Sequence, residues 1–172
     1  MSGVVIDAGG QNDNRSIPLA TRQGNWIRNV RKMERAPESM RAAEIAAHRL
    51  CPGIITRSLS GKYNCYGMVF ASRRVVIEHP EDVEQILRDD GYNRVHQNDV
   101  KIGDVIIYRK APNEEVQHVG LIVEVGRNIE AARIDLMILS QFGFDGEYFH
   151  PEHLVPPQYG THRDYYTERG RR

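Results

Sequence analysis

Three apolar runs in the second half of the chain, separated by short polar turns, constrain the fold more than any other feature. They cover Val105–Tyr108, Gln117–Val125 and Leu136–Ser140. The turn Gly103-Asp104 precedes the first run, and the polar loop at 112–115 separates the first from the second. Consecutive strands joined by short loops pair with one another in antiparallel fashion. We therefore predict an antiparallel meander over residues 105–140.

Helical patterns come earlier in the chain. Apolar residues recur at helical spacing between Pro37 and Leu50, and Cys51-Pro52-Gly53 ends that pattern. A second helix is predicted from Pro80, with an acidic first turn, to a cap at Gly91. Helices followed by strands are typical of an α+β domain, and 172 residues suit one domain with one core.

The two ends of the chain differ from this central part. Residues 1–36 are polar, with Trp26 and Ile27 as the only large apolar pair, and we interpret them as an N-terminal arm, with partial disorder left open. Residues 37–172 then form the domain. From Gly143 onward the chain is rich in Gly, Pro and aromatic residues, which we interpret as an ordered wrap over the sheet.

Composition limits the classes of partner. Lysine plus arginine and aspartate plus glutamate are balanced at 23 each, which gives no indication of a nucleic-acid partner. No apolar run approaches the roughly 18 residues of a membrane span, so no membrane association is predicted. The first residues lack the basic start and apolar segment of a secretory signal. We therefore expect synthesis in the cytoplasm, with export by a dedicated secretion route left open.

Candidate chemistry centres on Lys62–Ala71, where Cys65 follows a turn at Gly61 and precedes the apolar run 68–71. This pattern predicts a helix that begins near Cys65, ends near Ser72, and lowers the pKa of the thiol. A thiolate becomes a catalytic nucleophile when a base lies near it, and His118 in the second apolar run is the candidate. Cys51 is interpreted as a packing residue, and both cysteines are expected to be free thiols.

Three blocks of sequence together resemble the papain-like cysteine hydrolases of the NlpC/P60 and CHAP group: Asn64-Cys65-Tyr66-Gly67, Gly103-Asp104-Val105-Ile106-Ile107-Tyr108 and His118-Val119-Gly120-Leu121-Ile122. The resemblance covers about residues 58–143. It implies a papain-like α+β core with N-terminal helices packed on a central antiparallel sheet. It also implies that Cys65 is the nucleophile and His118 the general base.

The resemblance further implies a third polar residue, on the strand after His118, that orients its ring. Ser140 is the first choice there, with Gln141 and Asp135 as alternatives. Asn64 has two open interpretations, namely support of an oxyanion and capping of the helix. His150 and His153 are interpreted as loop residues, so no metal is predicted, and no cofactor is implied.

The function predicted from these residues is hydrolysis of an amide bond in a peptide or related substrate. A non-catalytic binding or structural module with the same fold is the first alternative, and acyl transfer through the same thiol is the second. Bacterial cell-wall peptides are the commonest target of the group. The missing export signal favours a toxin or phage-type effector, or an intracellular amidase or deconjugating peptidase. A partner or immunity protein is left open.

Overall fold

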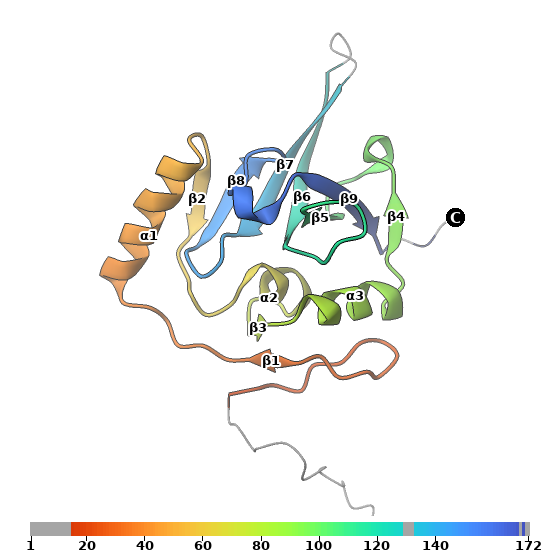
Figure 1. Ribbon diagram of the computed structural model, residues 1–172, viewed down its shortest axis with the longest axis horizontal. Coiled ribbons are helices and arrows are strands. Elements are labelled where there is room, and N and C mark those ends of the chain that lie inside the picture. The colour runs from red at the N-terminus through yellow and green to blue at the C-terminus, as the bar shows by residue number, and fades with distance from the viewer. Residues whose placement is uncertain (1–14, 129–132, 169, 171–172) are drawn as a thin grey trace, which may run out of the picture.

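A seven-stranded antiparallel sheet forms the centre of the protein (Figure 1). The computed structural model describes residues 15–128, 133–168 and 170. The sheet has the order β2-β8-β7-β6-β5-β9-β4, and β1 and β3 form a separate two-stranded pair. The strands are β1 Asn29–Val30, β2 Ile55–Ser58, β3 Val76–Ile77, β4 Asn93–Val95, β5 Val105–Arg109, β6 His118–Asn128, β7 Arg133–Gln141, β8 Glu147–Pro151 and β9 His162–Thr167.

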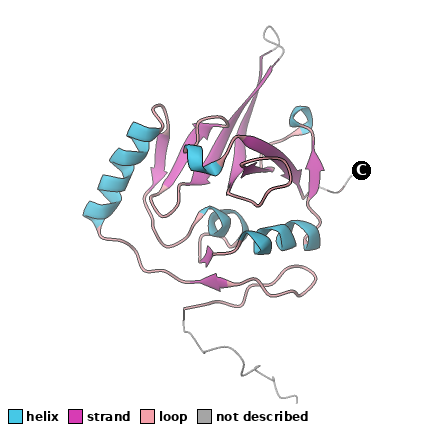
Figure 2. Cartoon of the chain, viewed as in Figure 1, coloured by secondary structure: helices cyan, strands magenta, loops and turns pink. Residues whose placement is uncertain are grey.

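Three α-helices lie within the described ranges: α1 Pro37–Leu50, α2 Cys65–Phe70 and α3 Pro80–Asp89. In Figure 1, α1 lies beside the edge strand β2, whereas α2 and α3 lie below the sheet, close to β3. Figure 2 shows the same arrangement by type of element, with the helices around the strands. The α+β class is therefore confirmed. No helix in these ranges combines the length and the apolar character needed to cross a membrane.

The predicted meander is confirmed, since β5, β6 and β7 are neighbours with antiparallel pairing. The interpretation of the C-terminal part as a wrap was wrong for two segments. Residues 147–151 pair with β7 and with β2, and residues 162–167 pair with β5 and with β4. One segment extends the sheet beyond β7 and the other extends it beyond β5. Successive side chains of a strand point to opposite faces, so each segment contributes side chains to both faces of the sheet.

Residues 15–36 are also part of the packed structure. Ile17 and Ile27 belong to the same buried cluster as Val83, Ile86 and Leu87 of α3. Asn29 holds this segment together, because its side chain accepts a hydrogen bond from the Ile17 N–H at 3.0 Å and donates to the Ile27 carbonyl at 2.9 Å. The predicted polar arm is thus packed on α3 from residue 15 onward. The first 14 residues lie outside the described part of the chain.

Candidate functional site

Cys65 is the first residue of α2, as predicted, and Asn64 caps that helix. The Asn64 side-chain oxygen accepts a hydrogen bond from the Gly67 N–H at 2.9 Å, and its amide donates to the Ile77 carbonyl at 2.7 Å. The same oxygen accepts a second bond, from the Ile77 N–H at 3.3 Å. Of the two interpretations left open for Asn64, this geometry corresponds to capping, and it also ties α2 to β3.

Gly67 lets the chain return close to α2. A Cβ atom added at this position would overlap the carbonyl oxygen of Val75, which directly precedes β3. The lack of a side chain at Gly67 therefore serves the approach of the protein's own backbone. A glycine tolerates such an approach at a cost in chain entropy that the packing must offset.

The Cys65 thiol is buried, with 6% of the residue exposed, and belongs to the same apolar cluster as Ile107 and Val119. Burial raises its pKa to about 12, and hydrogen bonds from the backbone N–H groups of Val119, Tyr66 and Cys65 oppose that rise only in part. The expectation of a lowered thiol pKa was wrong. Desolvation penalises the thiolate, and a six-residue helix offers a short dipole against it.

His118 begins β6 and is fully buried. It pairs with Tyr108, whereas Val119 pairs with Ile107. Because successive side chains of a strand point to opposite faces, His118 projects to the face opposite to Val119 and the thiol cluster. Its ring stacks on that of Tyr159, with ring centroids 3.9 Å apart and planes 4° from parallel.

Neither ring nitrogen of His118 has a hydrogen-bond partner, so the expected bond between this ring and the Cys65 thiol is absent in this conformation. Burial, with a smaller contribution from His150, holds the pKa of His118 well below its ordinary value. The Cys65 thiol accepts a hydrogen bond from the N–H of Val119, the residue directly after His118 on β6. The backbone therefore brings Cys65 near His118, but the two side chains are not joined. At rest both groups are neutral.

The candidates for the third residue have other partners. The Ser140 hydroxyl forms a hydrogen bond of 2.8 Å with Nε2 of His150. Gln141 donates to the Ser60 carbonyl at 2.7 Å, while its side-chain oxygen is buried without a partner. Asp135 pairs with Gly126 toward the far end of the β6–β7 hairpin, away from the His118 end of β6.

His150 is the residue near the site that sequence reasoning missed. The interpretation as a loop residue was wrong, because His150 lies on β8, is fully buried and pairs with Ile138. Burial lowers its pKa to about 4. The signal that could have revealed it is the alternation within 147–151, where Tyr148 and His150 share one face and Glu147 and Phe149 the other.

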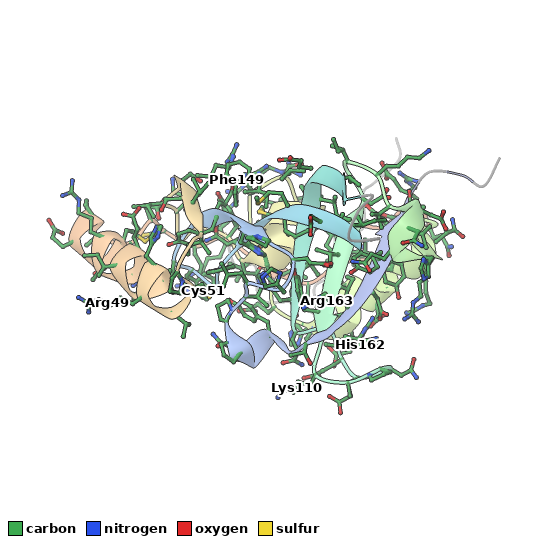
Figure 3. All side chains as sticks on the ribbon, turned by 90° about the horizontal axis from the view of Figure 1, so that it is seen from above. Arg49, Cys51, Lys110, Phe149, His162 and Arg163 are labelled. Carbon is green, nitrogen blue, oxygen red and sulfur yellow. The ribbon has the colours of Figure 1, made fainter. Side chains whose placement is uncertain are left out.

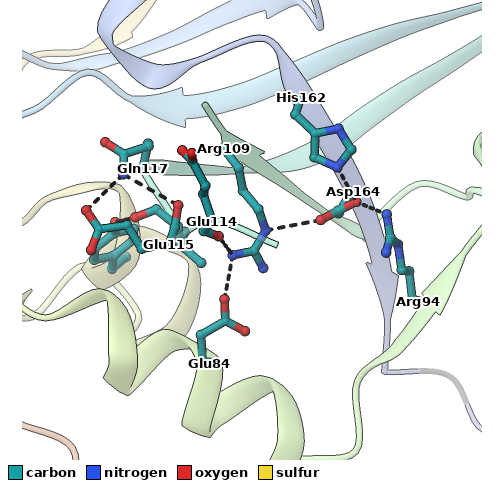
Figure 4. A network of polar contacts seen from close by, with 10 residues as sticks. Glu84, Arg94, Arg109, Glu114, Glu115, Gln117, His162 and Asp164 are labelled. Carbon is teal, nitrogen blue, oxygen red and sulfur yellow. Dashed lines mark hydrogen bonds and ion pairs between the residues drawn. The ribbon is translucent and has the colours of Figure 1, made fainter. Parts of the chain in front are cut away.

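A second polar cluster lies where β4, β5 and β9 meet α3 (Figure 4). Asp164 is buried and accepts hydrogen bonds from Arg109 at 3.1 Å and His162 at 3.0 Å, and it also pairs with Arg94. Arg109 reaches Glu84 of α3 at 2.6 Å. Cavities of about 630 Å³ and 450 Å³ adjoin this cluster, and both are lined by Arg94 and Asp164.

Figure 3 shows the two ends of the molecule, with Cys51 close to α1 and with His162 and Arg163 on β9. Cys51 is buried and, like Cys65, is a free thiol, as expected. Among the described residues, no group of three or more His, Cys, Asp or Glu side chains is arranged to hold a metal ion.

Comparison with protein-family models finds no match for this chain. Comparisons with curated proteins and with solved structures likewise return no significant match.

Proposed function

We propose that this protein is a thiol-dependent hydrolase with a papain-like core, in which Cys65 attacks the carbonyl carbon of an amide bond and His118 is the general base. The observation that carries the proposal is a fully buried imidazole with two unpartnered nitrogens, directly next to the residue whose N–H meets the thiol. Burying a polar group without a hydrogen bond costs free energy, and each exception calls for a reason. A proton acceptor held ready for Cys65 is such a reason.

The chemistry follows from the neutral resting state. As the sulfur forms its bond to the acyl carbon, the thiol proton passes to the imidazole, so no thiolate has to persist in the buried site. The imidazolium then protonates the leaving amine, and water hydrolyses the thioester to return the free thiol. Backbone N–H groups at the start of α2 and at Val119 stabilise the negative charge that develops.

The proposal requires a movement of His118. The ring stacks on Tyr159, within the short 3₁₀ turn Pro157–Tyr159 that covers it. Because His118 and the thiol lie on opposite faces of the sheet, rotation of the side chain alone does not join them. We infer that substrate binding displaces Tyr159 and lets the first residues of β6 turn, which carries the imidazole toward the thiol. In the closed state burial keeps the thiol protonated, so its acylation needs the imidazole as a base.

The test uses p-nitrophenyl acetate as a small activated acyl donor. Wild-type protein should form an acetyl thioester on Cys65, located by peptide mass mapping, and should then release acetate. Cys51→Ala, which removes the other buried thiol, is the matched control and should react like wild type. His118→Phe keeps an aromatic ring against Tyr159 and should slow acetylation by about 10²-fold or more.

Two results would contradict the hydrolase. One is p-nitrophenol release that is unchanged in Cys65→Ser, and the other is Cys65 acetylation that His118→Phe leaves unaffected. Either result would favour the alternative of a non-catalytic binding module. The buried, uncharged state of Cys65 and His118 is also compatible with that alternative. Transfer of the acetyl group to an added amine, faster than its hydrolysis, would instead support the acyltransferase alternative.

A further inference from the structure

We propose that the cavity beside Arg163 binds a free α-amino acid, with its carboxylate on the Arg163 guanidinium and its ammonium on the Glu152 carboxylate. The cavity has a volume of about 430 Å³, and polar side chains line most of it, among them Gln97, Asn98, Asp135, Glu152 and Arg163. Ligand pockets in proteins have volumes of about 300–1,000 Å³. Cys65 does not line this cavity, and the inference does not depend on the hydrolase.

Arg163 has no counter-ion among the described residues. It lies on β9, and its Nε atom is buried without a hydrogen-bond partner. No carboxylate within the described ranges forms an ion pair with its guanidinium. The neighbouring Asp164 projects to the other face of the sheet, where it is bound by Arg109 and Arg94. Burying an N–H group of a cation without a partner costs free energy, so a ligand that supplies an acceptor is favoured.

Two tyrosines link Arg163 to Glu152. Tyr108 is opposite Arg163 in the pairing of β5 with β9, and Tyr165 lies two residues further along β9, on the same face as Arg163. The Tyr108 hydroxyl donates to the Glu152 carbonyl at 2.9 Å, and the Tyr165 hydroxyl donates to Oε2 of Glu152 at 2.6 Å. Burial raises the pKa of both phenols, and the nearby charge of Arg163 opposes that rise. The guanidinium and the carboxylate therefore lie around the same two phenols.

Glu152 keeps the capacity to accept an ammonium group. Its Oε1 accepts a hydrogen bond from the Gln97 amide at 2.8 Å, and its Oε2 accepts the bond from Tyr165. A carboxylate offers about four lone-pair sites, so each oxygen can take a further N–H donor. Asp135 adds a second carboxylate to the lining. The cavity therefore combines a guanidinium with carboxylate groups.

This combination of charges selects the class of ligand. A phosphate or a simple carboxylate pairs with Arg163 but is repelled by Glu152 and Asp135, and a polyamine is repelled by Arg163. A free α-amino acid carries an ammonium and a carboxylate on the same carbon, so it complements both signs of charge. A residue within a peptide lacks these charges, because its amide bonds are neutral. Ile134 also lines the cavity and offers apolar surface to the side chain of the ligand.

The test is titration of the full chain with L-leucine, followed by calorimetry and by ¹H–¹⁵N spectra of the arginine Nε–H groups. A ligand of this size should bind with a Kd of about 1 mM or tighter and should shift the Arg163 Nε–H signal, which is identified by its loss in Arg163→Lys. Arg163→Lys should weaken leucine binding about tenfold or more, because an ammonium lacks the planar fork that pairs with a carboxylate. Arg49→Lys is the matched control, since Arg49 is exposed on α1 at the other end of the molecule (Figure 3). It should bind leucine as wild type does.

Two analogues of leucine test the two charges separately in wild-type protein, so this arm does not depend on whether a variant folds. Isocaproate lacks the ammonium and isoamylamine lacks the carboxylate, and each should bind at least about tenfold more weakly than leucine. Glu152→Gln should weaken leucine binding, whereas isocaproate should bind to it no less tightly than to wild type, because a repelling charge is removed.

Three results would overturn the amino-acid site. The first is an unchanged Arg163 Nε–H signal at about ten times the expected Kd of leucine. The second is equal affinity for leucine and for either analogue, which means that only one charge is recognised. The third is tighter binding of inorganic phosphate than of leucine, which indicates a simple anion site. All three readouts measure binding, so they stand whether or not Cys65 is catalytic.

Discussion

At the scale of single residues, the protonation of two buried histidines has the clearest consequence for this protein. His118 and His150 lie on one face of the sheet, and burial lowers the pKa of both, to about 4 for His150. A histidine that stays neutral in the folded state but is protonated in the unfolded chain makes stability depend on pH. The unpartnered nitrogens of His118 add a cost at every pH, because they give up water without gaining a partner.

We expect the free energy of unfolding to fall as the pH drops below about 6.5, the ordinary histidine value. In that range the unfolded chain binds protons that the folded protein excludes, so acid favours unfolding. His118→Phe should reduce this dependence by about 1.4 kcal/mol per pH unit and should be at least as stable as wild type near pH 7. Urea titrations between about pH 6 and pH 4.5 provide the measurement.

The control for this prediction is His153→Gln, which changes an exposed histidine just after β8. It should leave the pH dependence unchanged. An equal pH dependence in wild type and His118→Phe would mean that His118 is protonated in the folded protein, contrary to its burial.

At the scale of elements, α2 is held at both ends by one buried carboxylate. Glu147 of β8 is fully buried and accepts a hydrogen bond of 2.8 Å from Tyr63, just before the helix, and one of 2.5 Å from Arg73, just after it. Arg57 of β2 adds an ion pair at 2.5 Å. Burial by itself would raise the pKa of Glu147, but these partners outweigh burial and lower it. The start of α2 is thereby fixed against the sheet.

Glu147→Gln should destabilise the protein by about 3 kcal/mol, because it leaves the two arginines beside a neutral, buried amide. Thermal and urea unfolding measure this loss. Asp145→Asn is the matched control, since Asp145 pairs with Arg35 in a solvent-exposed ion pair, and it should cost less than about 1 kcal/mol. Equal effects of the two changes would show that the Glu147 cluster does not anchor α2.

At the scale of the whole molecule, the N-terminal segment and the last strand close the structure around the core. In Figure 1 the chain before β1 passes below α3. Arg28 of this segment pairs with Asp82 of α3 at 3.0 Å. On the other side of α3, Glu84 joins the Arg109 and Asp164 cluster that holds β9 against β5. Segments more than 130 residues apart in the chain therefore depend on the same helix.

Neighbouring residues of this segment provide a direct test of its packing. Ile27 is 3% exposed and lies in the main core cluster, whereas Trp26 is 71% exposed. Ile27→Ala should cost about 2–5 kcal/mol of unfolding free energy, through lost burial and the cavity left behind. Trp26→Ala should change it by less than about 0.5 kcal/mol. Similar stability of the two variants would mean that the segment only rests on the surface, as a polar arm would.

The sequence by itself determined the elements that depend on local pattern. The helix from Pro37 to Leu50 was predicted with its observed ends, and the helices at Cys65 and Pro80 with their observed starts. Helical periodicity, a proline in the first turn and the Asn64 cap are signals that each span only a few residues of the chain. They fix these positions without help from distant segments. The strands β5, β6 and β7 follow from the same local signals, because short loops leave consecutive strands little choice of partner.

Only the tertiary structure decided the outer strands and the state of the site. The strands β2 and β9 pair with segments distant in the chain, and no local pattern specifies a distant partner. β8 forms a hairpin with β7, but its second partner, β2, is about 90 residues earlier. The pKa of Cys65 depends on what packs over the thiol, so desolvation reversed the shift that its place at a helix start had predicted. The face on which His118 lies depends on the register of β5 with β6, and that register exists only once the sheet has formed.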